Sequence, residues 1–288
     1  MAVYKRSYRG YAGPVTSEWS RFAIIPRYAY LGLLRSKIMT AFFVICFVPP
    51  LVFLFLIYLA NNIGSFARVF GVTGATSPFA VDGEFFATFL GIQAGLSFVL
   101  TAFVGPGLIS SDLANRALPL YLSRPFTRAE YVIGKMSVLL MLLSLITWVP
   151  GLILFGAQGV MGGREWLSHN VWVAWAMFAG SWIWILVISL LALALSAWVK
   201  WRIAAGALLL AVFFVAAGFG EAINAVLEVH WGRLINLMYL FVTVWDRLFR
   251  ARETMEISES SAWLMLGLIC AGCLVLLNRK LRAFEVVK

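Results

Sequence analysis

"MSVLLMLLSLITWVPGLILFGAQGVMGG", residues 136–163, contains no Asp, Glu, Lys or Arg. A helix needs about 20 predominantly apolar residues to cross the hydrocarbon core of a bilayer. The stretch exceeds that length and consists mainly of Leu, Val, Ile, Met and Gly. It therefore predicts a membrane-spanning helix.

Further windows without these charged residues flank the stretch on both sides: 38–67, 85–111, 170–199, 203–220 and 260–278. Of the residues in the chain, 62% are hydrophobic and 12% are charged, against about a quarter charged in soluble proteins. The sequence predicts an all-α integral membrane protein, a single transmembrane domain over residues 1–288. We expect six spans, at about 38–60, 85–109, 134–158, 171–199, 203–220 and 260–278.

The orientation of the spans follows from the basic residues, because Lys and Arg near span ends are retained in the cytoplasm. With six spans, most of the 23 Lys and Arg residues fall on the side of the two termini. We therefore expect residues 1–37, the segment 110–133 and the tail 279–288 to be cytoplasmic. The net charge of +10 is then a topology signal, and no nucleic-acid partner is expected because a soluble basic patch is missing.

Two segments outside the spans carry their own pattern. Residues 18–37 interleave aromatic and aliphatic residues with Arg, which is typical of a helix lying in the headgroup layer of the bilayer; the alternative is a plain juxtamembrane linker. The segment 234–245 is apolar but only about half a membrane long. We interpret 221–259 as an external excursion of interfacial or re-entrant helices, since a seventh span would place the basic tail outside.

The expected spans lack the residues that membrane chemistry requires. The charge-free windows of these spans contain no Asp, Glu, Lys, Arg or His, and Gln93 and Gln158 are their main polar groups. Ion-coupled carriers and intramembrane hydrolases need such groups inside the membrane, so we expect no catalytic residue, no metal and no cofactor on this chain. A nucleotide-independent carrier or channel remains the alternative. The three cysteines, Cys46, Cys270 and Cys273, are interpreted as packing residues.

Proline and glycine recur within the spans and suggest hinges. Proline removes a backbone donor and kinks a helix, so we expect hinges at Pro106 in the second span and at Pro150 and Gly151 in the third. Gly91 and Gly95 form a Gly-x-x-x-Gly pattern that permits close helix packing, within one chain or between two.

The segment between the second and third spans, SSDLANRALPLYLSRPFTRAEYVIGK, residues 110–135, is basic and broken by proline. Ser110 or Ser111 is expected to cap a short helix with a crowded apolar face, and Pro125 ends it. Thr127 with Glu130 three residues later predicts a capping box for the next helix. A basic helix with an apolar face suits docking to another protein; the alternative is a loop helix that lies back on the membrane.

The same segment resembles the signature of ABC-2 type transporter permeases, in which an acidic residue leads a short helix that ends in a leucine-rich "LLSxP" and continues to "GK" at the third span. The residues that carry the resemblance are Asp112, Leu118, Leu122, Ser123, Pro125, Arg128, Tyr131, Gly134 and Lys135.

The resemblance implies an exporter in the bacterial cytoplasmic (inner) membrane, built from two permease chains, as a homodimer, each docked on a P-loop ATPase subunit. ATP and Mg would be bound by that partner, since Ala129 and Met136 exclude a phosphate loop at Gly134-Lys135. The residues expected to couple the chain to the ATPase are Asp112, Arg116, Leu118, Leu122, Arg124 and Arg128. The aromatic spans fit lipids, drugs or other amphiphiles as substrates.

Overall fold

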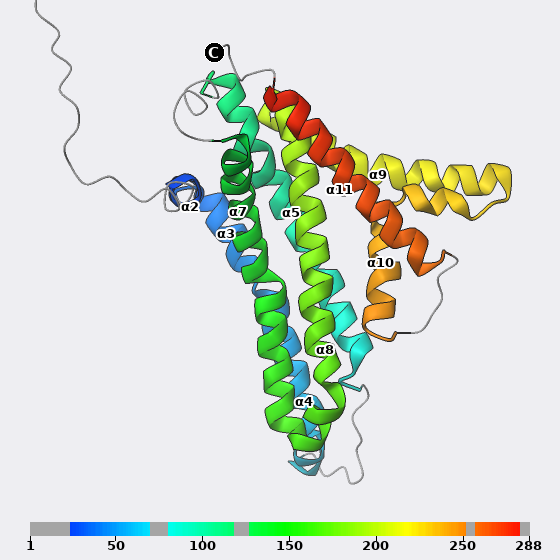
Figure 1. Ribbon diagram of the computed structural model, residues 1–288. Coiled ribbons are helices and arrows are strands. Elements are labelled where there is room, and N and C mark those ends of the chain that lie inside the picture. The colour runs from blue at the N-terminus through cyan, green and yellow to red at the C-terminus, as the bar shows by residue number, and fades with distance from the viewer. Residues whose placement is uncertain (1–23, 70–79, 118–126, 252–256, 283–288) are drawn as a thin grey trace, which may run out of the picture.

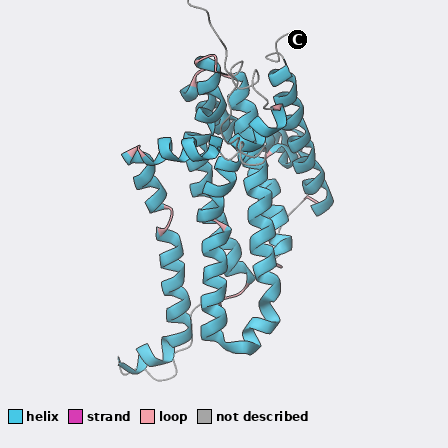
Figure 2. Cartoon of the chain, turned by 60° about the vertical axis from the view of Figure 1, so that its left-hand side comes forward, coloured by secondary structure: helices cyan, strands magenta, loops and turns pink. Residues whose placement is uncertain are grey.

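The computed structural model describes residues 24–69, 80–117, 127–251 and 257–282, and every element within them is helical. The elements pack as an elongated bundle in which α5 and α8 run side by side (Figures 1 and 2). In chain order they are α2 (Ile24–Leu34), α3 (Lys37–Ile45), α4 (Val48–Val69), α5 (Gly83–Ala114), α7 (Arg128–Ile146), α8 (Trp148–Trp198), α9 (Arg202–Leu227), the 3₁₀-helix η1 (Trp231–Ile235), α10 (Leu237–Leu248) and α11 (Glu259–Arg282).

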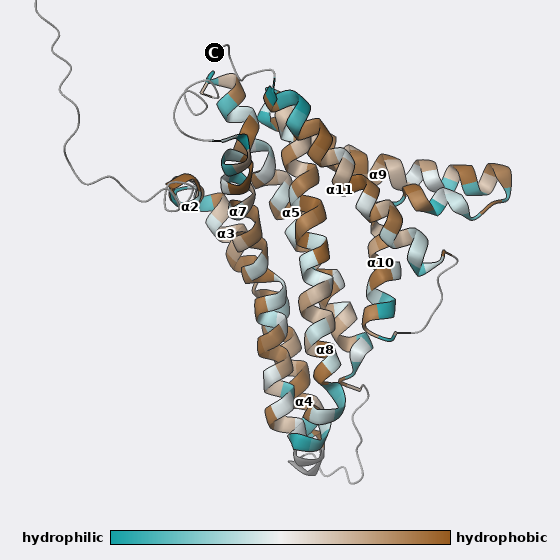
Figure 3. Cartoon of the chain, in the orientation of Figure 1, coloured by the Kyte–Doolittle hydropathy of each residue, from teal (hydrophilic) through white to brown (hydrophobic). Residues whose placement is uncertain are grey.

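Five helical stretches in the described residues are long and apolar enough to cross a membrane. Figure 3 shows the hydrophobic colour over the length of the bundle and the hydrophilic colour gathered mainly towards its two ends. The prediction of an all-α membrane-embedded protein is therefore confirmed. The five stretches are Lys37–Ile63, Gly83–Ala114, Arg128–Trp198, Arg202–Leu227 and Glu259–Arg282.

The stretch Arg128–Trp198 folds back on itself. It has 71 residues, which at 1.5 Å per residue would make a rod of about 100 Å, over three times the thickness of the hydrocarbon core. At Gly163 the backbone leaves the helical region, with φ 82° and ψ 175°, and the chain reverses at one end of the bundle (Figures 1 and 2). The ring centroids of Phe155 and Trp166 lie 5.6 Å apart, and those of Trp148 and Phe178 lie 5.4 Å apart. The two arms around Gly163 therefore pack antiparallel.

Breaks in the helices coincide with prolines. The break between α3 and α4 lies at Cys46 and Phe47, four and three residues before Pro50, whose missing N–H leaves the carbonyl of Cys46 without its helical donor. Gln93 of α5 supplies that donor, with Nε2 3.0 Å from the Cys46 oxygen. The break between α7 and α8 lies at Thr147, three residues before Pro150.

The range 234–245 forms η1 and α10 rather than one long helix. Phe241 and Trp245 are buried against Trp184 of α8, with ring centroids 4.7 Å and 5.8 Å from it. Trp245 also donates its Nε1–H to the carbonyl of Gly180 at 3.1 Å. These contacts attach α10 to the bundle by its aromatic face.

The helix α9 contains the fifth expected span, 203–220, and continues beyond it to Leu227. It runs across the long direction of the bundle instead of along it (Figure 1). Its outward side chains, such as Phe214 and Val215, are exposed. The fifth expected span is thus helical in the structure but not parallel to α5 and α8.

The turn at Gly163 yields a test of the hairpin. Its φ and ψ lie in a region that is essentially restricted to glycine and costs other residues about 1–3 kcal/mol, although the space around a Cβ would be open. We expect Gly163→Ala to lower the free energy of unfolding in detergent by about 1–3 kcal/mol. Gly156→Ala, on an exposed helical position with equally open space, is the control and should not destabilise. Equal stability of the two variants would contradict the hairpin geometry.

Candidate functional site

The candidate site lies where α5 ends and α7 begins, at the end of the bundle that also carries the end of α11 (Figure 1). Here α5 runs without interruption through Pro106 to Ala114. The prediction that Ser110 or Ser111 caps a new helix is therefore wrong. Both hydroxyls lie inside α5 and donate to carbonyls one turn back, those of Pro106 and Gly107.

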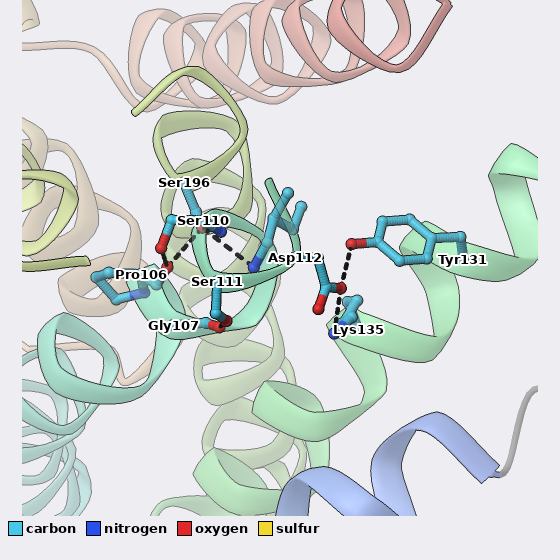
Figure 4. Close-up of polar contacts among 9 residues, drawn as sticks. Pro106, Gly107, Ser110, Ser111, Asp112, Tyr131, Lys135 and Ser196 are labelled. Atoms are coloured by element: carbon cyan, nitrogen blue, oxygen red, sulfur yellow. Dashed lines mark hydrogen bonds and ion pairs between the residues drawn. The ribbon is translucent and has the colours of Figure 1, made fainter. Parts of the chain in front are cut away.

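Asp112 joins the two helices. Its Oδ2 lies 2.7 Å from the Lys135 ammonium and accepts a 2.7 Å hydrogen bond from the Tyr131 hydroxyl (Figure 4). The side chains of Lys135 and Asp112 are 10% and 15% exposed, and Tyr131 is fully buried. We call these three residues the Asp112 clamp. A charge pair this little exposed is held in one geometry, because separating it would leave either charge without a partner away from water.

The start of α7 is fixed by its cap. The Thr127 N–H donates to Glu130 Oε2 at 2.7 Å, and the Glu130 N–H donates to Thr127 Oγ1 at 3.2 Å. The predicted capping box is thus confirmed. Because Tyr131 and Lys135 lie one and two turns further along α7, the cap also sets the direction from which they reach Asp112.

The region around Pro106 is attached to α8 and α9. Ser196 of α8 donates its hydroxyl to the Pro106 carbonyl at 2.8 Å and accepts the N–H groups of Ile109 and Ser110 at 3.2 Å and 2.9 Å (Figure 4). At the start of α9, Arg202 Nη2 donates to the Phe103 carbonyl at 2.9 Å. The buried Pro106, predicted as a hinge, is therefore held by side chains from two other helices.

The predicted hinge in the third span lies in the middle of the hairpin. Pro150 and Gly151 are buried at the start of α8. A Cβ on Gly151 would come within 2.7 Å of the Met177 sulfur of the opposite arm. Gly151 thus permits the close approach of the two arms.

Three of the predicted coupling residues, Asp112, Arg116 and Arg128, belong to the described part of the chain. Asp112 points into the clamp, Arg116 is exposed just after the end of α5 with φ 53°, and Arg128 is half-buried in the first turn of α7. Leu118, Leu122 and Arg124 lie outside the described residues, as do the end of the "LLSxP" pattern and Pro125.

Several residues of this site carried no functional signal of their own in the sequence. Tyr131 and Lys135 were noted only for the family resemblance, although their spacing of four places them on one face of α7. Ser196 and Arg202 had no recognisable signal, because only the packing of α8 and α9 against α5 brings them to the backbone near Pro106. Within the described residues no group of three His, Cys, Asp or Glu side chains could hold a metal ion.

No protein-family model matches the chain, and no curated protein matches it significantly. The function is therefore inferred from the residues and their geometry.

The Asp112 clamp can be tested by a double-mutant cycle. Removing one partner of a buried ion pair costs about 3–5 kcal/mol because the other charge stays buried and unpaired. We expect Asp112→Asn and Lys135→Met each to lower the free energy of unfolding in detergent by that amount, and the double variant to lose much less than the sum. Additive losses would show that the two charges do not act as a pair.

The attachment at Pro106 predicts a second effect. We expect Ser196→Ala to lower the free energy of unfolding by about 1–3 kcal/mol, because it removes a buried hydroxyl that serves three backbone groups. Ser168→Ala is the control, since Ser168 is exposed and bonds only to neighbours on its own helix. If the two variants have the same free energy of unfolding, the Ser196 hydroxyl does not stabilise the attachment at Pro106.

Proposed function

We propose that the chain is the membrane-spanning subunit of an ATP-driven exporter of the ABC-2 permease type. The observation that carries the proposal is the Asp112 clamp, which ties α5 to α7 at the base of the basic segment 110–133. Because the clamp joins the two helices, a force applied to the segment moves both α5 and α7. The likeness of the segment to the ABC-2 signature supplies the class of partner, a soluble P-loop ATPase that binds ATP and Mg.

In the proposed mechanism the ATPase grips the segment through the coupling residues Arg116, Leu118, Leu122, Arg124 and Arg128. Asp112 acts from inside, as the residue that fixes the end of α5 to α7. The rigid end belongs to α7, which is broken further along at Thr147, three residues before Pro150. A break at that point directs the movement into the bundle. ATP hydrolysis on the partner then opens and closes a path for an amphiphilic substrate.

The proposed membrane layout keeps the six expected spans and counts the two arms around Gly163 separately. The fifth of these spans is α9, which runs across the bundle in this structure. The end of the bundle that carries the clamp faces the cytoplasm. Basic residues at this end support that orientation, and they come from α5, α7, α9 and α11: Arg116, Arg128, Lys135, Arg202, Arg279, Lys280 and Arg282. Both termini then lie in the cytoplasm of a bacterial cell.

A second permease chain completes the proposed transporter. Gly91 and Gly95 on α5 have no atom within 4 Å of where a Cβ would lie, and Gly91 borders a pocket whose other wall is α10. Small residues on a membrane helix allow close approach of another helix. The open space beside these glycines supports a homodimer.

The docking of the ATPase is tested by charge reversal. We expect Arg116→Glu to reduce the amount of co-purified ATPase, because it reverses a charge at the rim of the docking segment. Leu122→Glu should reduce it further, about tenfold or more, since it removes an apolar anchor. The matched control is Arg164→Glu, an equally exposed arginine at the opposite end of the bundle, which should leave co-purification unchanged. Unchanged stoichiometry in Leu122→Glu, or substrate flux through the purified chain without nucleotide, would refute the proposal.

A further inference from the structure

A groove of about 680 Å³ lies between the start of α7 and the end of α11. The two helices hardly touch each other in the described part of the chain, since α11 packs mainly on α8 and α10. The groove is lined by Thr127, Arg128, Val132 and Ile133 on α7 and by Leu274, Leu277 and Asn278 on α11, among others. It is separate from the Asp112 clamp, whose residues do not line it.

The wall of the groove that belongs to α7 changes from polar to apolar away from the basic end, and the α11 wall is apolar except for Asn278. The helix α7 begins, and α11 ends, at the basic end of the bundle (Figure 1). Thr127 and Arg128 therefore lie near that end with Asn278 across from them, whereas Val132, Ile133 and Leu274 lie deeper along the helices. A groove with one polar end and an apolar floor has the shape of a phospholipid, with its headgroup at the surface and its acyl chains along the helices.

The charge at the polar end selects the headgroup. Arg128 lines the groove, and Arg282 follows one turn after Asn278 on the same side of α11. The carboxylate of Glu130 is held by the backbone and hydroxyl of Thr127. Two arginines at the surface of a leaflet attract anionic headgroups, at about fivefold in affinity for each basic residue.

We propose that this groove binds one anionic phospholipid of the surrounding leaflet, with its phosphate between Arg128 and Arg282 and an acyl chain along Ile133, Leu274 and Leu277. The site goes beyond the proposed function. It shares Arg128 with the proposed ATPase contact and otherwise depends only on the chain lying in a membrane. A lipid bound there fills the space between α7 and α11. It therefore connects α7, which carries Lys135 of the clamp, to α11.

The test is native mass spectrometry of the purified full-length chain titrated with phosphatidylglycerol and, separately, with phosphatidylcholine. We expect one phosphatidylglycerol to be retained and phosphatidylcholine to bind at least fivefold more weakly. Arg282→Gln should weaken the binding of phosphatidylglycerol about fivefold. Lys280→Gln, which removes a charge that lies over the Trp198 ring of α8 and outside the groove, should not.

The apolar part of the groove is tested by substitutions that leave every charged residue unchanged. Ile133 lines the groove and is 57% exposed, and Met141, about two turns further along α7 and outside the groove, is 58% exposed. We expect Ile133→Trp to fill the groove and release the lipid, and Met141→Trp to retain it. Both variants leave Arg128 and the docking segment intact, so the outcome is independent of ATPase docking. Undiminished phosphatidylglycerol binding by Ile133→Trp, equal affinity for phosphatidylcholine, or a disulfide between two copies of an Ile133→Cys variant would overturn the proposal.

Discussion

In hydrocarbon every backbone N–H and C=O must find its partner within the protein, and this constraint governs how the bundle is held together. Each proline in a span removes one backbone donor. Gln93 donates to the Cys46 carbonyl near Pro50, and Ser196 and Arg202 donate to carbonyls at and before Pro106. Each donor comes from a different helix. Pro50 and Pro106 therefore lie close to points where helices are attached to one another.

The attachments divide the bundle into parts of different character. At the basic end, the Asp112 clamp and the Thr127 cap hold α5 and α7 by charged and charge-assisted contacts, which are strong when sheltered from water. Further along, the break at Cys46 is tied to α5 by Gln93, whereas the break at Thr147 lies beside apolar contacts such as that of Trp148 with Phe178. Apolar contacts are not directional, so helix segments can shift past one another there with little loss. A rigid connection between α5 and α7 at one end, followed by a break within the helices further along, is the arrangement that the proposed mechanical coupling requires.

The sequence predicted those features that depend on local chemistry. Charge-free windows located the long helices, and Thr127 with Glu130 located the cap of α7. It did not predict that α5 continues through Ser110 and Ser111, because proline next to two glycines suggested an interruption and the backbone contacts with Ser196 were invisible. Nor did it predict the crosswise course of α9. The direction of a helix is decided by packing partners distant in the chain, and hydropathy carries no information about them.

The clamp changes the interpretation of Asp112. The sequence placed this carboxylate among the residues that contact an ATPase, yet in the structure it accepts from Tyr131 and pairs with Lys135. A carboxylate engaged by an ammonium and a hydroxyl inside the chain has little capacity left for a partner, and exposing it would leave Lys135 unpaired. Among the described residues, the other basic side chains next to the clamp in this segment are Arg116, which is exposed, and Arg128, which is half-buried. An ATPase that docks here needs an acidic rim around an apolar pocket, because a basic rim would face like charge.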